Sequence, residues 1–228
     1  MLGLREDFET RSQEIYDYLS LIKFLDGVDS EILANNNTTN LVITSSMKKT
    51  LKGTIYILLY NLVESTMREA ICYIHDDIKS KRICFDELLP SIQKEIIKRV
   101  KSEHIGLTDI VSSIRHGISI DIPYASFNKK KLFSGNITRD EINKKSLVYG
   151  FSCQSNFEIT KHGEKLDIVK QHRNDLAHGN ISFSEIGKDK TPSDLLTVCD
   201  EVIAYLEAIT SNIEEYVRHQ KYKPETDE

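Results

Sequence analysis

Two side chains that can act on a phosphate ester lie close together in the second half of the chain. Arg173 carries a guanidinium group, which binds phosphate and stays charged at every relevant pH, and His178 carries an imidazole, which gains or loses a proton near neutrality. Three polar residues accompany them: His172 precedes the arginine, and Asn174 and Asp175 follow it directly. A fixed cation beside a proton carrier is what cleavage of a phosphodiester requires.

Helical periodicity indicates how these residues are positioned. We expect a helix over residues 163–178, because Arg173 shares a stripe with three apolar residues, namely Leu166, Val169 and Leu176. The guanidinium takes the place of an apolar side chain, so it must be paired inside the protein or face a cleft or an interface. Gly179 and Asn180 suit a left-handed cap that leaves His178 on the last turn. In the alternative interpretation, the arginine stem only covers the helix surface and the histidine only caps the helix.

Apolar residues at helical spacing recur along most of the chain and predict an all-α protein. We expect a bundle of about six to seven helices with one long loop and at most trivial strand. The expected helices cover residues 5–25, 46–78, 85–103, 107–114, 138–149, 163–178 and 192–218. Pro90 either kinks or splits the third of them. Residues 117–136 lack a helical period and are expected to form the long loop, which begins with a strand-like alternation, and residues 181–190 a second loop.

Capping residues mark the start of two of these helices. Thr138 and Glu141 form a capping box, in which each side chain can bond the backbone N–H of the other residue. Thr191 supplies an N-cap, followed by Pro192 in the first turn and Asp194 at the third position. The last helix is therefore expected to begin at this point.

One polar stripe interrupts the otherwise apolar helix expected over residues 46–78. Its members are spaced i, i+3, i+4 and i+7 on one face: Asn61, Glu64, Ser65 and Arg68. Either this stripe is a solvated surface with a Glu64–Arg68 pair, or Glu64 or Asn61 orients Arg173 across the bundle. The sequence leaves both interpretations open.

A short basic run lies in the expected long loop. Lys129, Lys130 and Lys131 stand between Phe127 and Phe133. Lysines flanked by aromatic rings can bind RNA, because the ammonium groups contact phosphates while the rings stack on unpaired bases. The alternative is a solvated run of charge without a ligand.

The composition limits the kinds of protein that fit. A net charge of −5 and a pI near 5.8 argue against a surface that coats nucleic acid throughout, so any RNA contact must be local. The four cysteines are widely spaced, and we expect buried, reduced thiols with neither a metal nor a cofactor site. The charged start and short apolar runs lead us to expect a cytoplasmic protein without membrane contact. Residues 1–220 should form one domain, followed by a polar, disordered tail over residues 221–228.

The stretch from Arg173 to His178, Arg-Asn-Asp-Leu-Ala-His, resembles the Arg-x4-His motif of the HEPN superfamily. Asn174 is of the polar type usual in that motif, which the family also places just before the last long helix. Residues 58–64, Leu-Leu-Tyr-Asn-Leu-Val-Glu, and residues 132–137, Leu-Phe-Ser-Gly-Asn-Ile, resemble a bacterial HEPN-like nuclease family of this length. The resemblance extends over residues 5–220 and implies a HEPN-like helical domain.

The resemblance also implies an activity. HEPN proteins of this type are metal-independent endoribonucleases, often toxins or defence effectors, so an antitoxin or another defence-system protein is a possible partner. They dimerise so that two motifs meet in one cleft, and they are expected to cleave single-stranded RNA to 2′,3′-cyclic phosphate and 5′-hydroxyl ends. Some members are inactive, and the alternative is a catalytically silent scaffold or regulatory dimerisation module.

Site roles follow from the motif and from the residues around it. The expected catalytic residues are Arg173, His178 and Asn174, and the accessory residues are Asp175, Glu64, Asn61 and His172. Asn174 would hold the phosphate or the imidazole tautomer, Asp175 would position a neighbouring cation, and His172 would contact phosphate. Asn180 stands where a HEPN subgroup silenced by adenylylation has a tyrosine, so we do not expect that form of control.

Overall fold

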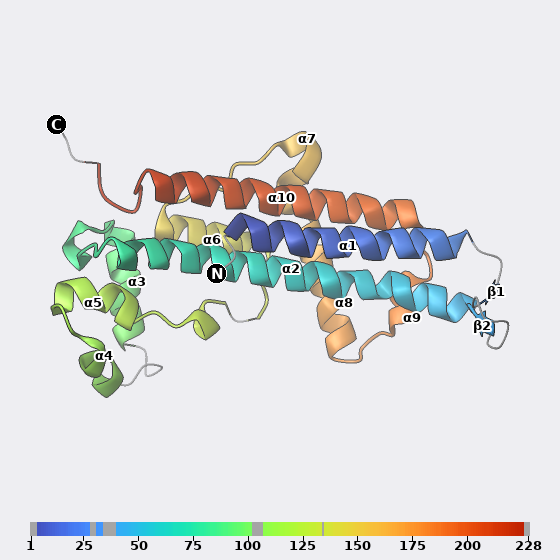
Figure 1. Ribbon diagram of the computed structural model, residues 1–228, viewed down its shortest axis with the longest axis horizontal. Coiled ribbons are helices and arrows are strands. Elements are labelled where there is room, and N and C mark those ends of the chain that lie inside the picture. Colours follow the sequence, from blue (N-terminus) through green and yellow to red (C-terminus); the bar gives the residue numbers. More distant parts are fainter. Residues whose placement is uncertain (1–3, 28–30, 34–39, 102–106, 134, 226–228) are drawn as a thin grey trace. The chain divides into compact units, whose positions relative to one another are not determined.

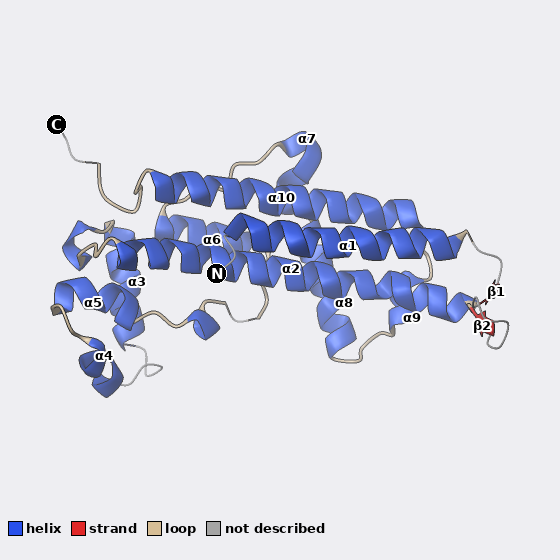
Figure 2. Ribbon diagram, in the orientation of Figure 1, coloured by secondary structure: helices blue, strands red, loops and turns tan. Residues whose placement is uncertain are grey.

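The computed structural model describes residues 4–27, 31–33, 40–101, 107–133 and 135–225. Within these ranges it contains ten α-helices, three short 3-10 helices and one antiparallel hairpin, formed by β1 (Glu31–Leu33) and β2 (Asn40–Val42) (Figures 1 and 2). The all-α prediction is confirmed, and the described strand is limited to this hairpin. The helices beyond the six or seven expected are short ones in stretches that we expected to be loops or did not assign.

Contacts divide the chain into two compact units, whereas the sequence predicts one domain over residues 1–220. Unit 1 consists of Met1–Glu64 and Asn156–Leu206, and unit 2 consists of Ser65–Ser155 and Glu207–Glu228. Two long helices contribute to both units, α2 (Ser45–Ser80) and α10 (Pro192–Arg218). Within the described ranges, no helix is both long and apolar enough to cross a membrane.

Unit 1 begins with α1 (Leu4–Asp26), which matches the first predicted helix closely. Its buried apolar residues recur at helical spacing: Leu4, Phe8, Ile15, Leu19, Ile22 and Leu25. Polar contacts attach this helix to α2. The Tyr18 hydroxyl donates to the carbonyl oxygen of Leu51 at 3.0 Å, and the Lys52 ammonium lies 2.6 Å from the Asp26 carboxylate. Polar contacts thus join the second half of α1 to the first half of α2.

A short helix, α9 (Phe183–Gly187), lies within residues 181–190, so the prediction of a simple loop there is wrong. The Ser182 side chain begins it by accepting a hydrogen bond from a backbone N–H three residues on, at 3.2 Å. A Cβ atom added to Gly187 would lie 2.0 Å from the carbonyl oxygen of Lys49 in α2. Only glycine permits such a close approach of two backbones, so α9 fixes the chain that follows the motif against α2.

Unit 2 contains the shorter helices. They are α3 (Pro90–Lys101), α4 (Leu107–Ser113), α5 (Ile118–Ala125) and α6 (Arg139–Tyr149), with 3-10 turns at Phe85–Glu87 and Lys129–Lys131. Pro90 splits the expected third helix, because proline suits a first helical turn but not a helix interior. At the start of α6, Thr138 accepts a hydrogen bond from the Glu141 N–H at 3.3 Å, as the capping residues predict.

The long loop expected over residues 117–136 is the main error of the sequence prediction, because it contains α5. Asp121 explains the difference. Its buried carboxylate accepts the backbone N–H groups of Arg115 and His116, each at 2.6 Å, and the hydroxyl of Tyr124. These bonds, with His116 contributing most, hold the pKa of Asp121 below its usual value. Side-chain bonds of this kind organise the backbone without leaving an apolar period in the sequence.

A buried polar network lies in the core of unit 2. The Nε2 atom of His75 is 2.8 Å from the Tyr149 hydroxyl, which also accepts a hydrogen bond from Arg99 at 2.5 Å. The Phe127 ring stacks on the imidazole with 3.8 Å between ring centroids. Burial, together with the positive charges of Arg99 and Lys145, lowers the pKa of His75 well below 6.5, so the ring is neutral at pH 7.

The packing of unit 2 continues beyond residue 220, the predicted end of the domain. Tyr222 is fully buried, and its hydroxyl donates to Asp77 at 2.7 Å. Its carbonyl oxygen accepts the Leu89 N–H at 2.8 Å. The predicted start of the disordered tail, residue 221, is therefore too early. The polar residues around Tyr222 hide the fact that this tyrosine is buried.

Candidate functional site

The helix that carries the motif, α8 (Lys165–Ala177), ends as the sequence predicts. Gly179 adopts the left-handed conformation, with φ of +69°, and the Asn180 N–H donates to the carbonyl oxygen of Asp175 at 2.9 Å. This bond closes a Schellman cap. His178 is the C-cap residue, and its side chain is exposed. The cap therefore fixes the backbone of His178 and leaves its imidazole exposed to solvent.

Arg173 lies against an aromatic ring of α2. Its guanidinium carbon is 3.7 Å from the centroid of the Tyr60 ring, and Tyr60 is only 2% exposed, so the core holds this ring in place. A cation over an aromatic face is attractive by about 0.5–2 kcal/mol, and more as the pair loses water. The arginine side chain itself is 21% exposed. Arg173 is therefore neither a solvated surface arginine nor a buried unpaired charge.

Two polar groups lie at the edge of the same guanidinium. Its Nη1 atom donates to the Asn174 side-chain oxygen at 2.8 Å, and its Nη2 atom lies 4.0 Å from the Glu64 carboxylate. Both side chains of this ion pair are partly exposed, so the attraction between Glu64 and Arg173 is modest. Its main effect is to orient the guanidinium. Of the two polar residues proposed to orient Arg173, the structure thus places Glu64 next to it.

One face of α2 contacts the motif region. Gly53, Tyr56, Tyr60 and Glu64 follow one another at intervals of three or four residues, which keeps them on the same side of a helix. Gly53 approaches α9, where an added Cβ atom would meet the Phe183 carbonyl. Tyr60 and Glu64 contact Arg173, as described above. This face positions the motif.

His172 has a partner of its own on that face. Its imidazole meets the Tyr56 ring edge-on, with 4.4 Å between ring centroids. Burial, and then the charge of Lys190, lowers the pKa of His172, which keeps the ring neutral. Burial also raises the pKa of Tyr56 to about 12, so the tyrosine keeps its proton. Two neutral rings in contact form a rigid support beside Arg173.

Asp175 lies on the exposed side of the motif helix. Its carboxylate accepts hydrogen bonds from the side-chain amides of Gln171, at 2.9 Å, and Asn180, at 3.4 Å. These bonds lower the pKa of Asp175, and the nearby His172 and His178 lower it slightly further. Asp175 is therefore a stable anion near the C-terminal end of the motif helix.

The basic run and its aromatic neighbours have other contacts. Lys129 forms an ion pair with Glu69, and its carbonyl oxygen accepts a hydrogen bond from Arg68 at 2.9 Å. Phe127 stacks on His75, and Phe133 is buried. The interpretation that these rings stack on bases is therefore wrong for Phe133 and unfavourable for Phe127. Lys131 is exposed, and the side chain of Lys130 falls outside the part of the chain that the structure describes.

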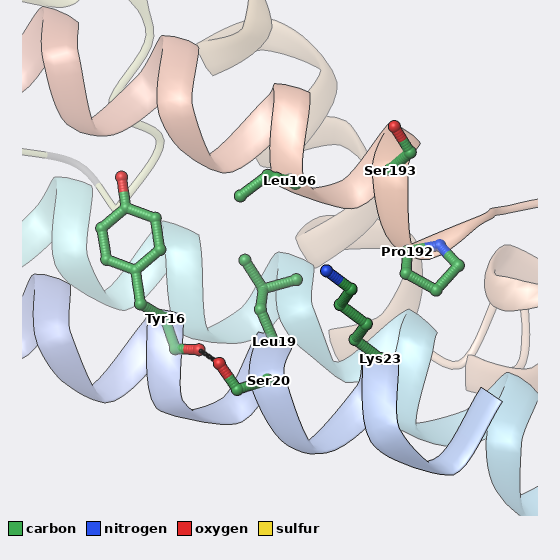
Figure 3. A pocket seen from close by; sticks show the side chains of 7 residues that line it. All are labelled: Tyr16, Leu19, Ser20, Lys23, Pro192, Ser193 and Leu196. Carbon is green, nitrogen blue, oxygen red and sulfur yellow. Dashed lines mark hydrogen bonds between the residues drawn. The ribbon is translucent and has the colours of Figure 1, made fainter. Parts of the chain in front are cut away.

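Asn61, the other polar residue proposed to orient Arg173, is exposed and lines a hollow of about 280 Å³ with Arg11, Glu14 and Tyr18 of α1. A second hollow in unit 1, of about 300 Å³, is lined by Tyr16, Leu19, Ser20, Lys23, Pro192, Ser193 and Leu196. Figure 3 shows the Lys23 side chain lying between Leu19 and Pro192. This second hollow lacks a carboxylate or an imidazole, so it offers no proton carrier for phosphate chemistry.

Sequence reasoning missed two residues of the site, Tyr56 and Tyr60. In the sequence, Tyr56 is only one member of an apolar helix, and Tyr60 belongs to the segment 58–64 that resembles the nuclease family but has no role assigned to it. The spacing of Tyr60 to Glu64, four residues, was the available signal, because it places the ring and the carboxylate on one face. Among the described residues, no three His, Cys, Asp or Glu side chains form a group that could hold a metal ion.

Comparison with known proteins bears on this arrangement. A family model described as HEPN_MAE_28990-like HEPN matches residues 3–222, which is nearly the whole chain. Neither the curated proteins nor the solved structures contain a match to this chain. The matched range includes both elements of the candidate site, α2 and α8, as well as the cap at His178.

Proposed function

The chain belongs to the HEPN_MAE_28990-like HEPN family, and on this premise we propose that it is a metal-independent endoribonuclease acting on single-stranded RNA. The observation that carries the proposal is the support of Arg173 on the ring of Tyr60, with Asn174 and Glu64 at its edge. A guanidinium held in this way needs little reorganisation when charge develops on a phosphate. His178 supplies the proton carrier from the exposed helix end.

The chemistry requires two proton carriers, and each chain supplies one motif histidine. We infer a homodimer in which two motifs share one cleft. His178 of one copy accepts the proton of the ribose 2′-hydroxyl as that oxygen attacks phosphorus, and His178 of the second copy protonates the departing 5′-oxygen. The bond from phosphorus to the 2′-oxygen forms and the bond to the 5′-oxygen breaks. The products are a 2′,3′-cyclic phosphate and a 5′-hydroxyl, and Arg173 offsets the negative charge of the phosphorane between them.

The remaining residues have supporting roles in this proposal. Asn174 and Glu64 orient the guanidinium, and Asp175 positions a neighbouring cation. His172 supports the arginine through its packing on Tyr56, a role that differs from the phosphate contact expected from the sequence.

A catalytically silent scaffold is the second candidate, and one observation favours it. Tyr60, Glu64 and Asn174 contact the guanidinium within a single protomer, which is also how a structural arginine would be held. The two candidates differ in what they require of His178. A scaffold does not need an exposed imidazole at the end of α8, whereas a nuclease does.

Incubation of the purified protein with labelled single-stranded RNA in EDTA separates the two candidates. A nuclease of this type cleaves the RNA without metal and leaves cyclic phosphate ends, which a 3′-phosphatase removes only after acid opens the ring. Light scattering should give about twice 26.2 kDa. Intact RNA after prolonged incubation would favour the scaffold, and full activity from a strict monomer would contradict the shared cleft.

We further propose that the nuclease acts as a toxin or defence effector, with an antitoxin or another defence-system protein as partner. Expression of the wild-type chain in a bacterial host should then arrest growth, whereas expression of His178→Ala at the same level should not. Equal growth of both cultures would contradict the toxin role and leave the nuclease proposal in place.

A further inference from the structure

Two aromatic rings are held together in solvent at the turn that leads into the motif helix. Phe157 begins α7 (Phe157–Thr160), is 50% exposed, and lies 5.0 Å from the exposed His162 ring, measured between centroids. The ammonium group of Lys161 lies 5.0 Å from the centroid of the same phenylalanine ring. Ile159, also in α7, is 54% exposed. The group therefore combines exposed aromatic surface with one cationic group, that of Lys161, at the surface of unit 1.

The backbone that holds these rings is strained. Lys161 and His162 have φ values of +46° and +54°, and Gly163 follows at +78°. The left-handed region is unfavourable for residues with a Cβ atom, and glycine or asparagine adopts it at lower cost. Gly163 accounts for the shape of the turn, because an added Cβ atom there would lie 3.0 Å from the Tyr205 ring. The close approach to Tyr205 thus accounts for glycine at residue 163, but no packing contact of this kind accounts for a histidine at residue 162.

The strained backbone at residue 162 places the imidazole beside the Phe157 ring. Neither ring is buried, so their contact adds little to the core. Backbone strain that adds nothing to packing tends to occur where a ligand binds. From this geometry we propose that Phe157 and His162 form a stacking site for an unpaired base of single-stranded RNA. The inference rests on the proposed function, because it names a subsite for the same substrate.

The chemistry of the group favours RNA over a protein partner. Bases of single-stranded RNA stack on aromatic side chains without regard to sequence, and cations beside such rings contact the phosphates. Lys161 provides the cation, although its ammonium donates to the carbonyl oxygen of Glu158 at 2.9 Å and lies 4.0 Å from that residue's carboxylate. The site also has a suitable place along the chain. From Lys165 to Arg173 the axis of α8 rises by about 12 Å, so a strand bound at the turn can continue along the motif helix.

Binding of 2′-O-methyl RNA tests the proposal, because this RNA lacks the attacking hydroxyl and stays intact. The full-length protein is titrated, in EDTA, into a fluorescein-labelled ten-nucleotide strand and into a strand of the same length with abasic positions. We expect Phe157→Ala to weaken binding of the first strand by roughly 5-fold to 150-fold, the equivalent of ~1–3 kcal/mol, and to change binding of the abasic strand little. His162→Asn removes the imidazole at a position where asparagine tolerates the backbone, and it should act in the same direction.

Two control variants make the result specific. Ile159→Ala removes a similarly exposed apolar side chain that has no aromatic face, and Phe157→Trp keeps one, so both should bind like the wild type. Equal binding of the two strands by the wild type, or unchanged binding by Phe157→Ala, would overturn the stacking site. Weakening by Ile159→Ala together with a halved mass in light scattering would instead identify a protein interface. Discrimination between the strands without cleavage of ordinary RNA would support the stacking site and refute the nuclease.

Discussion

Replacement of Arg173 by lysine separates a catalytic arginine from a structural one. Lysine keeps the charge and most of the aliphatic stem, but it lacks the planar fork that lies 3.7 Å over the Tyr60 ring and donates to Asn174 at 2.8 Å. A point charge on a flexible stem cannot make both contacts and also hold a phosphate in two-point contact. The variant therefore tests the geometry of the group and leaves its charge unchanged.

The expected magnitude follows from the contacts that are lost. A missing donor at a site that stabilises developing charge costs about 2–4 kcal/mol in the transition state, which corresponds to a rate roughly 30-fold to 1000-fold lower. The folded state should lose less. Contact with the ring is worth about 0.5–2 kcal/mol, and the Glu64 pair, with side chains 21% and 30% exposed, adds at most about 1 kcal/mol, of which lysine keeps part. Arg173→Lys should thus raise the activation free energy of cleavage by more than it lowers the free energy of unfolding.

The assay measures kcat/KM on a labelled single-stranded RNA in EDTA and the free energy of unfolding by urea, on the same preparations. Tyr60→Phe keeps the aromatic face under the guanidinium and should keep the wild-type kcat/KM. Tyr60→Leu removes the face and should lower kcat/KM. It should also reduce the additional effect of Arg173→Lys, because the two residues are in contact. Wild-type kcat/KM in a destabilised Arg173→Lys protein would refute the reasoning and make the arginine structural.

Three further predictions follow from particular contacts. His178→Ala should lower kcat by roughly 100-fold or more with the helical circular dichroism unchanged, since the residue lies at an exposed helix end; equal rates would mean a different proton carrier. Burial and the positive charges of Arg99 and Lys145 lower the pKa of His75, so the neutral ring contributes its full stability above pH 6.5. This contribution is lost as the pH falls toward the lowered pKa, by up to about 1.4 kcal/mol per pH unit. Between pH 7.5 and 5.5 the free energy of unfolding by urea should therefore fall less for His75→Gln than for the wild type, and an equal fall in both proteins would exclude this histidine as a source. Gly187→Ala places a Cβ atom 2.0 Å from a backbone oxygen and should cost about 1–3 kcal/mol or more, whereas Gly27→Ala, whose nearest neighbour is at 3.7 Å, should be nearly neutral in the same thermal melts.

The long helices could be predicted from the sequence because their signals are local. The apolar stripe of α1, the cap of α6 at Thr138 and the start of α10 at Thr191 all depend on residues within one or two turns of each other. The start of α10 shows this most directly, since the Asp194 N–H donates to the Thr191 hydroxyl oxygen at 3.1 Å while the Asp194 carboxylate accepts the Thr191 N–H at 2.9 Å. Such bonds form wherever the spacing permits them.

The short helices could not be predicted in the same way. The start of α5 depends on one carboxylate, that of Asp121, which bonds backbone groups five and six residues earlier in the chain. α9 depends on its contact with α2, where Gly187 meets Lys49 across more than 100 residues of sequence. Periodicity assigns a face to a helix, but it does not name the partner of that face.

The difference between local signals and contacts between distant segments also applies to the motif. Arg173 and His178 are five residues apart, so their order on α8 follows from the sequence alone. The orientation of the guanidinium does not, because Tyr60 and Glu64 belong to another helix. An Arg-x4-His sequence without an aromatic ring and a carboxylate on the facing helix would keep the charge but would lose the fixed plane of donors. The geometry on which the proposed phosphate contact depends is therefore a property of α2 and α8 together, and we expect substitutions on α2 to lower the proposed activity as strongly as some within the motif.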